Sequence, residues 1–243
     1  MFKGSISVDR EEPGYIISIE GNIGSGKSTL FKALKETCDP SCLLEKKIIF
    51  LEEPVDEWCR IKDANNHSIL DLFYQDMNKY AFSFQMMAYI SRLKKLKETV
   101  ERYPNAIVIT ERCLQSDKNV FAKMLHEDGH LNSVEYQIYN MWFDYFSKDL
   151  PKIFYVEVRT SPQLCLQRIR QRNRKGEDSI TLPYLTRLHN YHKKWLTGPN
   201  TPPTYLVNGH DDKDAFGDHM ISILNISGLE LDASSELNRN EFK

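Results

Sequence analysis

Short apolar runs, each the length of a β-strand, alternate along the chain with longer stretches of helical periodicity. The run of Ile107, Val108 and Ile109 is apolar on both faces of a strand, which is typical of a parallel sheet covered by helices. The pattern predicts an α/β fold, a three-layer sandwich with a five-stranded parallel sheet, helices on both faces and an active site at the C-terminal strand ends. The expected strands cover residues 15–19, 48–51, 106–110, 153–158 and 204–207.

Two stretches have the pattern of distinctive helices. Residues 67–102 contain neither Pro nor Gly and place apolar side chains three and four positions apart, and the polar residues near 76–78 predict a break. Residues 161–172 form an arginine-rich helical stretch, which the polar, glycine-containing residues 174–178 follow. We expect an arginine-rich lid over about 168–180, in which residues 174–178 form a mobile loop.

Composition narrows the class of protein. The 243 residues carry a formal net charge of −2, without the basic excess that a nucleic-acid binder usually shows. The longest apolar runs fall far short of the roughly 20 residues that a membrane-spanning helix needs. The five scattered cysteines are typical of reduced thiols, and the N-terminal segment lacks the apolar core of a signal peptide. We therefore expect a cytoplasmic or nuclear protein with neither a nucleic-acid nor a membrane partner.

A glycine-rich phosphate-binding motif follows the first expected strand. Residues 21–28 fit the pattern G-x-x-x-x-G-K-[ST] of a P-loop, at the junction of a strand and a helix. Its backbone N–H groups can cradle phosphates, Lys27 can reach the β- and γ-phosphates of ATP or another NTP, and the Ser28 hydroxyl can bind Mg²⁺. The alternative is a glycine-rich turn that binds nothing. The expected nucleotide-binding positions are Gly21, Asn22, Ile23, Gly24, Ser25, Gly26, Lys27, Ser28 and Thr29.

Charged residues follow the second and third expected strands. Glu53 lies at a strand end before Pro54, and its carboxylate can accept a proton from an acceptor hydroxyl. Glu111 can hold Mg²⁺, and Arg112 can contact the acceptor or Glu53. The alternatives are a solvated acidic loop for Glu53 and a surface ion pair for Glu111 and Arg112.

The combination of these motifs resembles the deoxyribonucleoside kinase family. The resemblance runs from about Tyr15 to Trp195, and several spaced motifs carry it. They are the P-loop, Glu53-Pro-Val-x-x-Trp58, Phe82-Ser-Phe-Gln85 with Ser91-Arg92, Glu111-Arg112 with Ser116-Asp117, and Arg168 through Tyr184.

The resemblance implies transfer of the γ-phosphate of ATP to the 5′-hydroxyl of a deoxynucleoside. By similarity, Glu53 is the general base, Tyr74 and Glu177 bind the sugar 3′-hydroxyl, and Gln85 pairs with the nucleobase. Trp58, Phe84 and Tyr74 can stack on the base. The alternative for each of them is packing in the hydrophobic core. The lid arginines that clamp phosphates are Arg168, Arg172 and Arg174, with Arg172 acting in catalysis beside Lys27, Glu53 and Arg112. Analogy with the family also implies a homodimer built through long helices.

Three further positions bear on the choice of nucleoside. Ala88, Arg92 and Asp117 match positions that separate the cytidine and purine enzymes of the family from the thymidine enzymes. An ionised Asp117 only accepts hydrogen bonds, so it favours a base that presents an amino group over thymine. The alternative is an Arg92–Asp117 ion pair that merely shapes the pocket. We expect deoxycytidine, deoxyadenosine or deoxyguanosine to be preferred over thymidine.

The sequence departs from the family at two places. Cys113 stands where the family usually has Ser, and residues 208–212 lack an aromatic residue that some relatives have near the donor base, which leaves the donor open among ATP, GTP and UTP. Two rival functions are a nucleotide kinase of the thymidylate type and a catalytically silent P-loop module. We expect an N-terminal extension over 1–14, a kinase domain over 15–226 and a flexible tail over 227–243.

Overall fold

A parallel five-stranded sheet forms the centre of the protein in the computed structural model, which describes residues 13–37, 47–174, 177–211, 215–216, 219 and 222–223. The strands lie in the order β2-β3-β1-β4-β5, and every neighbouring pair is parallel. The sequence predicted each strand to within one residue at either end. Their bounds are Tyr15–Glu20 (β1), Ile48–Leu51 (β2), Ile107–Glu111 (β3), Ile153–Arg159 (β4) and Thr204–Asn208 (β5).

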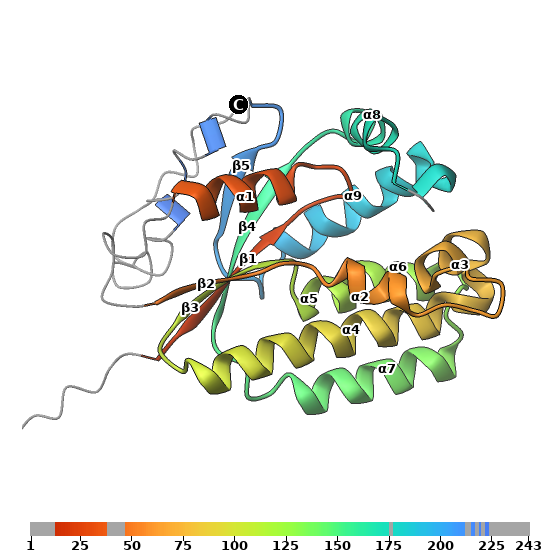
Figure 1. The fold of residues 1–243 in the computed structure, drawn as a ribbon, viewed down its shortest axis with the longest axis horizontal. Coiled ribbons are helices and arrows are strands. Elements are labelled where there is room, and N and C mark those ends of the chain that lie inside the picture. Colours follow the sequence, from red (N-terminus) through yellow and green to blue (C-terminus); the bar gives the residue numbers. More distant parts are fainter. Residues whose placement is uncertain are drawn as a thin grey trace, which may run out of the picture.

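Helices join the strands and cover both faces of the sheet (Figure 1). They begin with Lys27–Thr37 (α1), Val55–Arg60 (α2), Ile69–Gln75 (α3), Met77–Arg102 (α4), Leu114–Ser116 (α5) and the π-helical Asp117–Ala122 (η1). Then come Lys123–Glu127 (α6), Ser133–Phe146 (α7), Pro162–Arg172 (α8), the 3₁₀-helical Glu177–Ser179 (η2) and Leu182–Leu196 (α9).

The predicted break in the long helical stretch is confirmed. Ser68 caps α3 by accepting a hydrogen bond from the backbone of Asp71, whose carboxylate bonds back to Ser68. Asp76 then leaves helical geometry, with φ −146° and ψ 85°, and its side chain caps α4 by accepting from the backbone N–H of Lys79. The cap therefore starts a new helix, α4, immediately after α3.

The two faces of the sheet bury different side chains, because alternate strand residues point to opposite faces. Ile17 and Ile19 pack in one cluster with Leu30 and Leu34 of α1. Ile16 packs on the other face in a cluster that holds Leu96 of α4 and Leu196 of α9. A further cluster joins α4 to α7, which forms an outer layer in Figure 1. The expected sandwich is confirmed, and its strands are fixed from both sides.

Some expectations fall on residues that the structure does not describe. These are the extension over 1–12, the tail over 227–243, residues 175–176 of the lid, Asp212, and two of the cysteines, Cys38 and Cys42. Cys59, Cys113 and Cys165 are free thiols. Among the described helices, none is both long and apolar enough to cross a membrane.

Candidate active site

A cavity of about 640 Å³ opens where β1, β2 and β3 end. Three predicted positions, Gly21, Asn22 and Ser25, do not line this cavity, and they lie in the P-loop that forms one of its walls. The predicted residues that line it are Ile23, Gly24, Gly26, Lys27, Ser28, Thr29, Glu53, Trp58, Tyr74, Phe84, Gln85, Ala88, Arg92, Glu111, Arg112, Asp117, Arg168, Arg172, Arg174 and Glu177. Residues from many separate parts of the chain thus meet at one edge of the sheet.

The glycines of the P-loop have backbone conformations that other residues rarely adopt. Gly24 has φ +75°, and a Cβ atom placed there would lie 2.6 Å from the carbonyl oxygen of Cys165 in α8. Asn22 supports the loop from within, because its side chain donates to the carbonyl of Leu185 at 2.8 Å and accepts from the backbone N–H of Ile23. The loop is therefore packed closely against α8 and α9.

Lys27 begins α1 with its ammonium group buried at the mouth of the loop. The ammonium donates to the carbonyl oxygen of Asn22 at 2.7 Å. Burial and the positive charge of Arg112 together lower the pKa of Lys27 to about 8, against the opposing pull of Glu111 and Glu53. Since the pKa is near neutrality, a bound polyphosphate would strongly favour the charged ammonium.

Ser28 and Glu111 meet across the sheet, 83 residues apart in sequence. The Ser28 hydroxyl donates to Oε1 of Glu111 at 2.8 Å. A hydroxyl and a carboxylate are hard oxygen donors that suit Mg²⁺, which usually keeps water and phosphate oxygens as its remaining ligands. The described residues contain no group of three or more His, Cys, Asp or Glu side chains that could hold a metal alone. The pair therefore fits an ion that a nucleotide brings with it, rather than a cage made by the protein.

Glu53 lies between two guanidinium groups. Its Oε1 is 3.0 Å from Nη2 of Arg92 and 3.6 Å from Nε of Arg112. Burial alone would raise the pKa of Glu53, but Arg92, Arg112 and Lys27 outweigh it and hold the pKa below its usual range. The carboxylate is therefore ionised near neutral pH.

Arg92 connects three separate segments of the cavity wall. Its Nε donates to Oδ2 of Asp117 at 3.0 Å, and its Nη1 donates to the backbone carbonyl of Glu111 at 3.0 Å. Burial opposes the charge of Arg92, but Asp117 and Glu53 raise its pKa. Burial raises the pKa of Asp117, and the charge of Arg92 opposes that rise. The ion pair that the sequence offered as an alternative role for these two residues is present, and Asp117 also lines the cavity.

Arg112 has an unusual backbone and a fully enclosed side chain. Its φ is +64°, and its N–H donates to the carbonyl of Ile19 in β1 at 3.0 Å. The guanidinium lies over the ring of Phe121, 4.8 Å from its centroid, and Nη1 is 3.3 Å from Nε2 of His192. Only 4% of Arg112 is exposed, so the alternative of a surface ion pair is wrong for this residue.

Glu20 is a buried carboxylate behind the site that the sequence reasoning missed. Its Oε1 accepts from the Ser18 hydroxyl at 2.7 Å and from both the backbone N–H and the thiol of Cys113 at 3.1 Å. Burial raises the pKa of Glu20, against the opposing charge of Arg112. A signal was available in the sequence, because Glu20 is the last residue of β1 before the P-loop, and Glu53 similarly follows the end of β2. The Cys113 thiol thus makes a local contact despite the absence of the usual Ser.

An aromatic group lines the opposite part of the cavity. Phe73 and Phe84 stack with ring centroids 4.5 Å apart, and Trp58 meets Phe84 edge to face at 5.6 Å. These side chains are also core residues, because they belong to the cluster of α3, α4 and α7. Gln85 is 2% exposed, and its Oε1 has no partner among the described residues. An unpaired buried oxygen is costly, so it favours a ligand that supplies a donor.

The lid arginines divide between the P-loop and Glu177. Arg168 donates to the carbonyl oxygen of Ser25 at 3.1 Å. Arg172 donates to both oxygens of the buried Glu177, at 2.9 and 2.7 Å, and Arg174 lies 3.5 Å from the same carboxylate. Burial, followed by Tyr184 and Glu177, raises the pKa of Tyr74. Its hydroxyl is therefore protonated and can donate a hydrogen bond at neutral pH.

The sequence also gave no reason to select several other residues that surround the cavity. Phe216 lies beyond the loop that was expected to lack an aromatic residue, and it lines the cavity near Gly26. His192 is buried behind Arg112 without lining the cavity. The further lining residues that were missed include Phe73, Phe121 and Tyr184. Their sequence pattern is that of ordinary core positions, so only the fold identifies them.

Comparisons with known proteins agree with this arrangement. The family model for deoxynucleoside kinase matches residues 17–226. Deoxycytidine kinase 2 of Gallus gallus is 33% identical over 200 residues, which cover 74% of this chain and 73% of that protein. Deoxycytidine kinase of Homo sapiens is 32% identical over 202 residues, 74% of each chain. The mitochondrial deoxyguanosine kinase of Xenopus laevis is 29% identical over 246 residues, 89% of this chain and 90% of that protein.

Proposed function

We propose that this chain, which belongs to the deoxynucleoside kinase family, transfers the γ-phosphate of ATP to the 5′-hydroxyl of a deoxynucleoside that presents an amino group on its base. The observation that carries this proposal is one cavity that holds the P-loop lysine, the ionised Glu53 and the aromatic group around Gln85. Phosphate, hydroxyl and base can therefore be bound side by side. Another NTP could serve as the donor.

The transfer needs a base, a phosphate clamp and an oriented acceptor. Glu53 accepts the proton of the 5′-hydroxyl as that oxygen attacks the γ-phosphorus, an effect worth about 10²- to 10⁴-fold in rate. Lys27 binds the β- and γ-phosphates, and Arg112 holds Glu53 and the acceptor end in place. The lid cations Arg168, Arg172 and Arg174 stabilise the charge that spreads over the transferring group. Mg²⁺ held by Ser28 and Glu111 would neutralise charge on the phosphate oxygens.

The acceptor side supports an amino-bearing base. Gln85 offers a buried oxygen without a protein partner, and Asp117 presents a carboxylate to the cavity beside Ala88. Both oxygens can accept a hydrogen bond from a base amino group. Thymine carries the acceptor O4 at that place, and an ionised Asp117 has no proton to donate to it. An unpaired group of this kind costs about 1–3 kcal/mol, or roughly tenfold to a hundredfold in preference. The names of the relatives, deoxycytidine and deoxyguanosine kinase, point in the same direction. Tyr74 and Glu177 are the groups we assign to the 3′-hydroxyl.

The test is a comparison of kcat/KM for deoxycytidine, deoxyadenosine, deoxyguanosine and thymidine with ATP and Mg²⁺. An amino-bearing base should lead, and Glu53→Gln should lower kcat by about a hundredfold or more because it removes the proton acceptor. Glu52→Gln is the matched control, since Glu52 is an exposed neighbour that also lines the cavity and pairs with Lys35. That variant should keep its activity.

The same experiment separates the rival functions. Turnover of a nucleoside would contradict a catalytically silent module. Rejection of every nucleoside in favour of monophosphates would contradict our proposal and support a nucleotide kinase of the thymidylate type. A lead for thymidine would leave the kinase reaction in place and contradict only the role given to Asp117.

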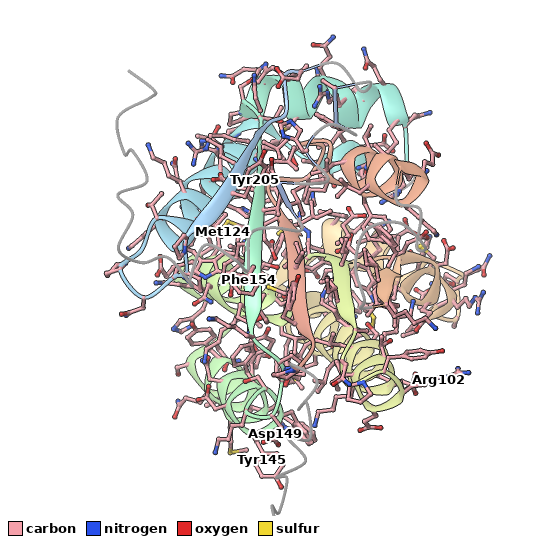
Figure 2. The ribbon with its side chains drawn as sticks, turned by 90° about the vertical axis from the view of Figure 1, so that its left-hand side faces the viewer. Arg102, Met124, Tyr145, Asp149, Phe154 and Tyr205 are labelled. Atoms are coloured by element: carbon pink, nitrogen blue, oxygen red, sulfur yellow. The ribbon has the colours of Figure 1, made fainter. Side chains whose placement is uncertain are left out.

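We also propose that the kinase domain spans residues 15–226 and forms a homodimer. Helix α7 supports the dimer, because large apolar side chains at spacings of three and four are exposed along it. Figure 2 shows one of them, Tyr145, at the rim of the molecule, whereas Phe154 lies along a strand of the sheet. The exposed residues are Val134, Ile138, Met141, Trp142 and Tyr145.

A further inference from the structure

Arg112 depends on neighbouring side chains for its position. Its backbone is left-handed, with φ +64°, and its contact with Glu53, Nε to Oε1 at 3.6 Å, is longer than a normal hydrogen bond. The ring of Phe121 supports one face of the guanidinium without fixing its rotation. Among the described residues, the other polar contact of the guanidinium joins Nη1 to Nε2 of His192 at 3.3 Å.

His192 reaches Arg112 from α9 and is itself held in one orientation. Its Nδ1 lies 2.9 Å from the carbonyl oxygen of Leu188, one helical turn earlier. Because a carbonyl only accepts, Nδ1 carries the proton, and Nε2 is left as an acceptor for the N–H of Arg112 at 3.3 Å. The ring is 2% exposed and meets Phe121 edge to face, with centroids 6.1 Å apart. The tautomer follows from these two contacts.

We infer that His192 is a positioning residue for the phosphoryl transfer, which acts by accepting a hydrogen bond from Arg112 and so aims the guanidinium at Glu53 and the acceptor hydroxyl. This inference rests on the proposed function. His192 does not line the cavity, so it touches neither substrate and acts only through Arg112. Its effect should fall on the chemical step, because binding of the base and the sugar uses other residues.

The charges around His192 keep its imidazole neutral. Arg112 faces it from the segment after β3, Lys27 from the start of α1, and His189 from its own helix, while Leu188 contributes only a carbonyl. Burial, followed by the charge of Arg112, places the pKa of His192 well below its usual range. A protonated imidazole would lose its acceptor and repel Arg112. The contact therefore persists across the neutral pH range.

Two substitutions of similar length separate an acceptor from mere packing. His192→Gln can keep an acceptor near the position of Nε2, whereas His192→Met fills the space without one. We expect His192→Met to lower kcat by roughly tenfold or more, with KM for nucleoside and ATP nearly unchanged, and His192→Gln to recover most of that loss. Equal losses in the two variants, or losses mainly in KM, would overturn the inference.

Coupling to Arg112 gives a second kinetic readout. In an Arg112→Met background, which has no N–H donor at this position, His192→Met should lower kcat by less than about threefold, because the contact that it removes is already lost. A full additional loss in that background would overturn the inference. Thermal unfolding midpoints of the variants show whether each remains folded.

A readout without turnover keeps the inference testable if no nucleoside is phosphorylated, a result that would contradict the proposed function alone. We would follow the imidazole nitrogen resonances against pH and assign His192 as the signal missing from His192→Gln. In the wild type, we expect the ring of His192 to stay neutral, with its proton on Nδ1, as the pH passes about 6.5, where an ordinary histidine titrates. In Arg112→Met, we expect the pKa of His192 to be higher than in the wild type, because the charge of Arg112 lowers it. A proton on Nε2 or ordinary titration in the wild type would overturn the inference.

Discussion

The charged residues at the strand ends differ in how far the protein itself neutralises them. Arg92 donates to two carboxylates and a carbonyl, so its charge is largely used within the cavity wall. Lys27, in contrast, donates to the neutral carbonyl of Asn22. A buried cation without a carboxylate partner in contact is costly, and a polyphosphate would supply the missing negative charge. Lys27 is thus a residue whose charge is available to the donor.

This difference predicts how donor binding depends on pH. Lys27 is charged below its pKa of about 8 and neutral above it, so kcat/KM for ATP should fall as pH rises through about 8 in the free enzyme. Glu53 does not cause that fall, because its pKa is held below its usual range. Lys27→Arg should remove the fall, since a guanidinium stays charged. The measurement is the profile of kcat/KM for ATP against pH.

Lys32 provides the matched control for this profile. It lines the same cavity, and Lys32→Arg should leave the fall near pH 8 in place. A fall that persists unchanged in Lys27→Arg, or that disappears in Lys32→Arg, would contradict the assignment to Lys27.

At the scale of single elements, the P-loop depends on close backbone contact with α8. Gly24→Ala would place a methyl group 2.6 Å from the carbonyl oxygen of Cys165, at a φ of +75° that already disfavours alanine. We expect this variant to unfold at a lower temperature and to lose most of its stabilisation by ATP, because the phosphate cradle must open to relieve the clash. Thermal unfolding with and without ATP and Mg²⁺ measures both effects.

Gly129→Ala separates backbone strain from the clash. Gly129 has a similar φ of +80°, but a Cβ atom there would meet nothing within 4 Å. It should cost only the strain of a left-handed alanine, of order 1–3 kcal/mol, and keep the stabilisation by ATP. If the two variants behave alike, close packing of the P-loop is not what Gly24 provides.

The sequence predicts elements better than contacts between them. Apolar runs bounded by polar residues located the strands, and the polar interruption at Asp76 located the helix break. The meeting of Ser28 with Glu111 depends on β1 lying beside β3, and strand order is not encoded in any local pattern. His192 is harder still, because it lies 80 residues from Arg112 and its helix has an ordinary amphipathic pattern. Motif spacing could identify Lys27 and Glu53 as candidates and Arg112 as a partner of Glu53, but only the fold shows that Arg92 also holds Glu53.

At the scale of the whole molecule, the polar and apolar features lie on different sides. The strand ends gather the buried charges around the cavity, while α7 lies as an outer layer beyond α4 (Figure 1). Residue Ile90 of α4 is also exposed, at 47%, which adds apolar surface on a helix that packs against α7. An apolar surface of this kind is typical of an interface, and it lies where a second copy would not need to enter the cavity.

The proposed dimer can be tested by placing charge on this surface. Met141 and Tyr145 are 66% and 69% exposed, so Met141→Glu combined with Tyr145→Glu should leave the monomer folded. If a second copy covers α7 in a dimer, the two new carboxylates would lose their water there, which is costly. We expect light scattering during gel filtration to give the mass of a dimer for the wild type and of a monomer for this variant.

Leu206→Glu is the control, because Leu206 is also exposed, at 42%, but lies on the edge strand β5. It should remain a dimer. A monomeric wild type, or a variant at α7 that stays dimeric, would contradict the assignment of α7, and loss of the dimer in Leu206→Glu alone would place the interface at the sheet edge.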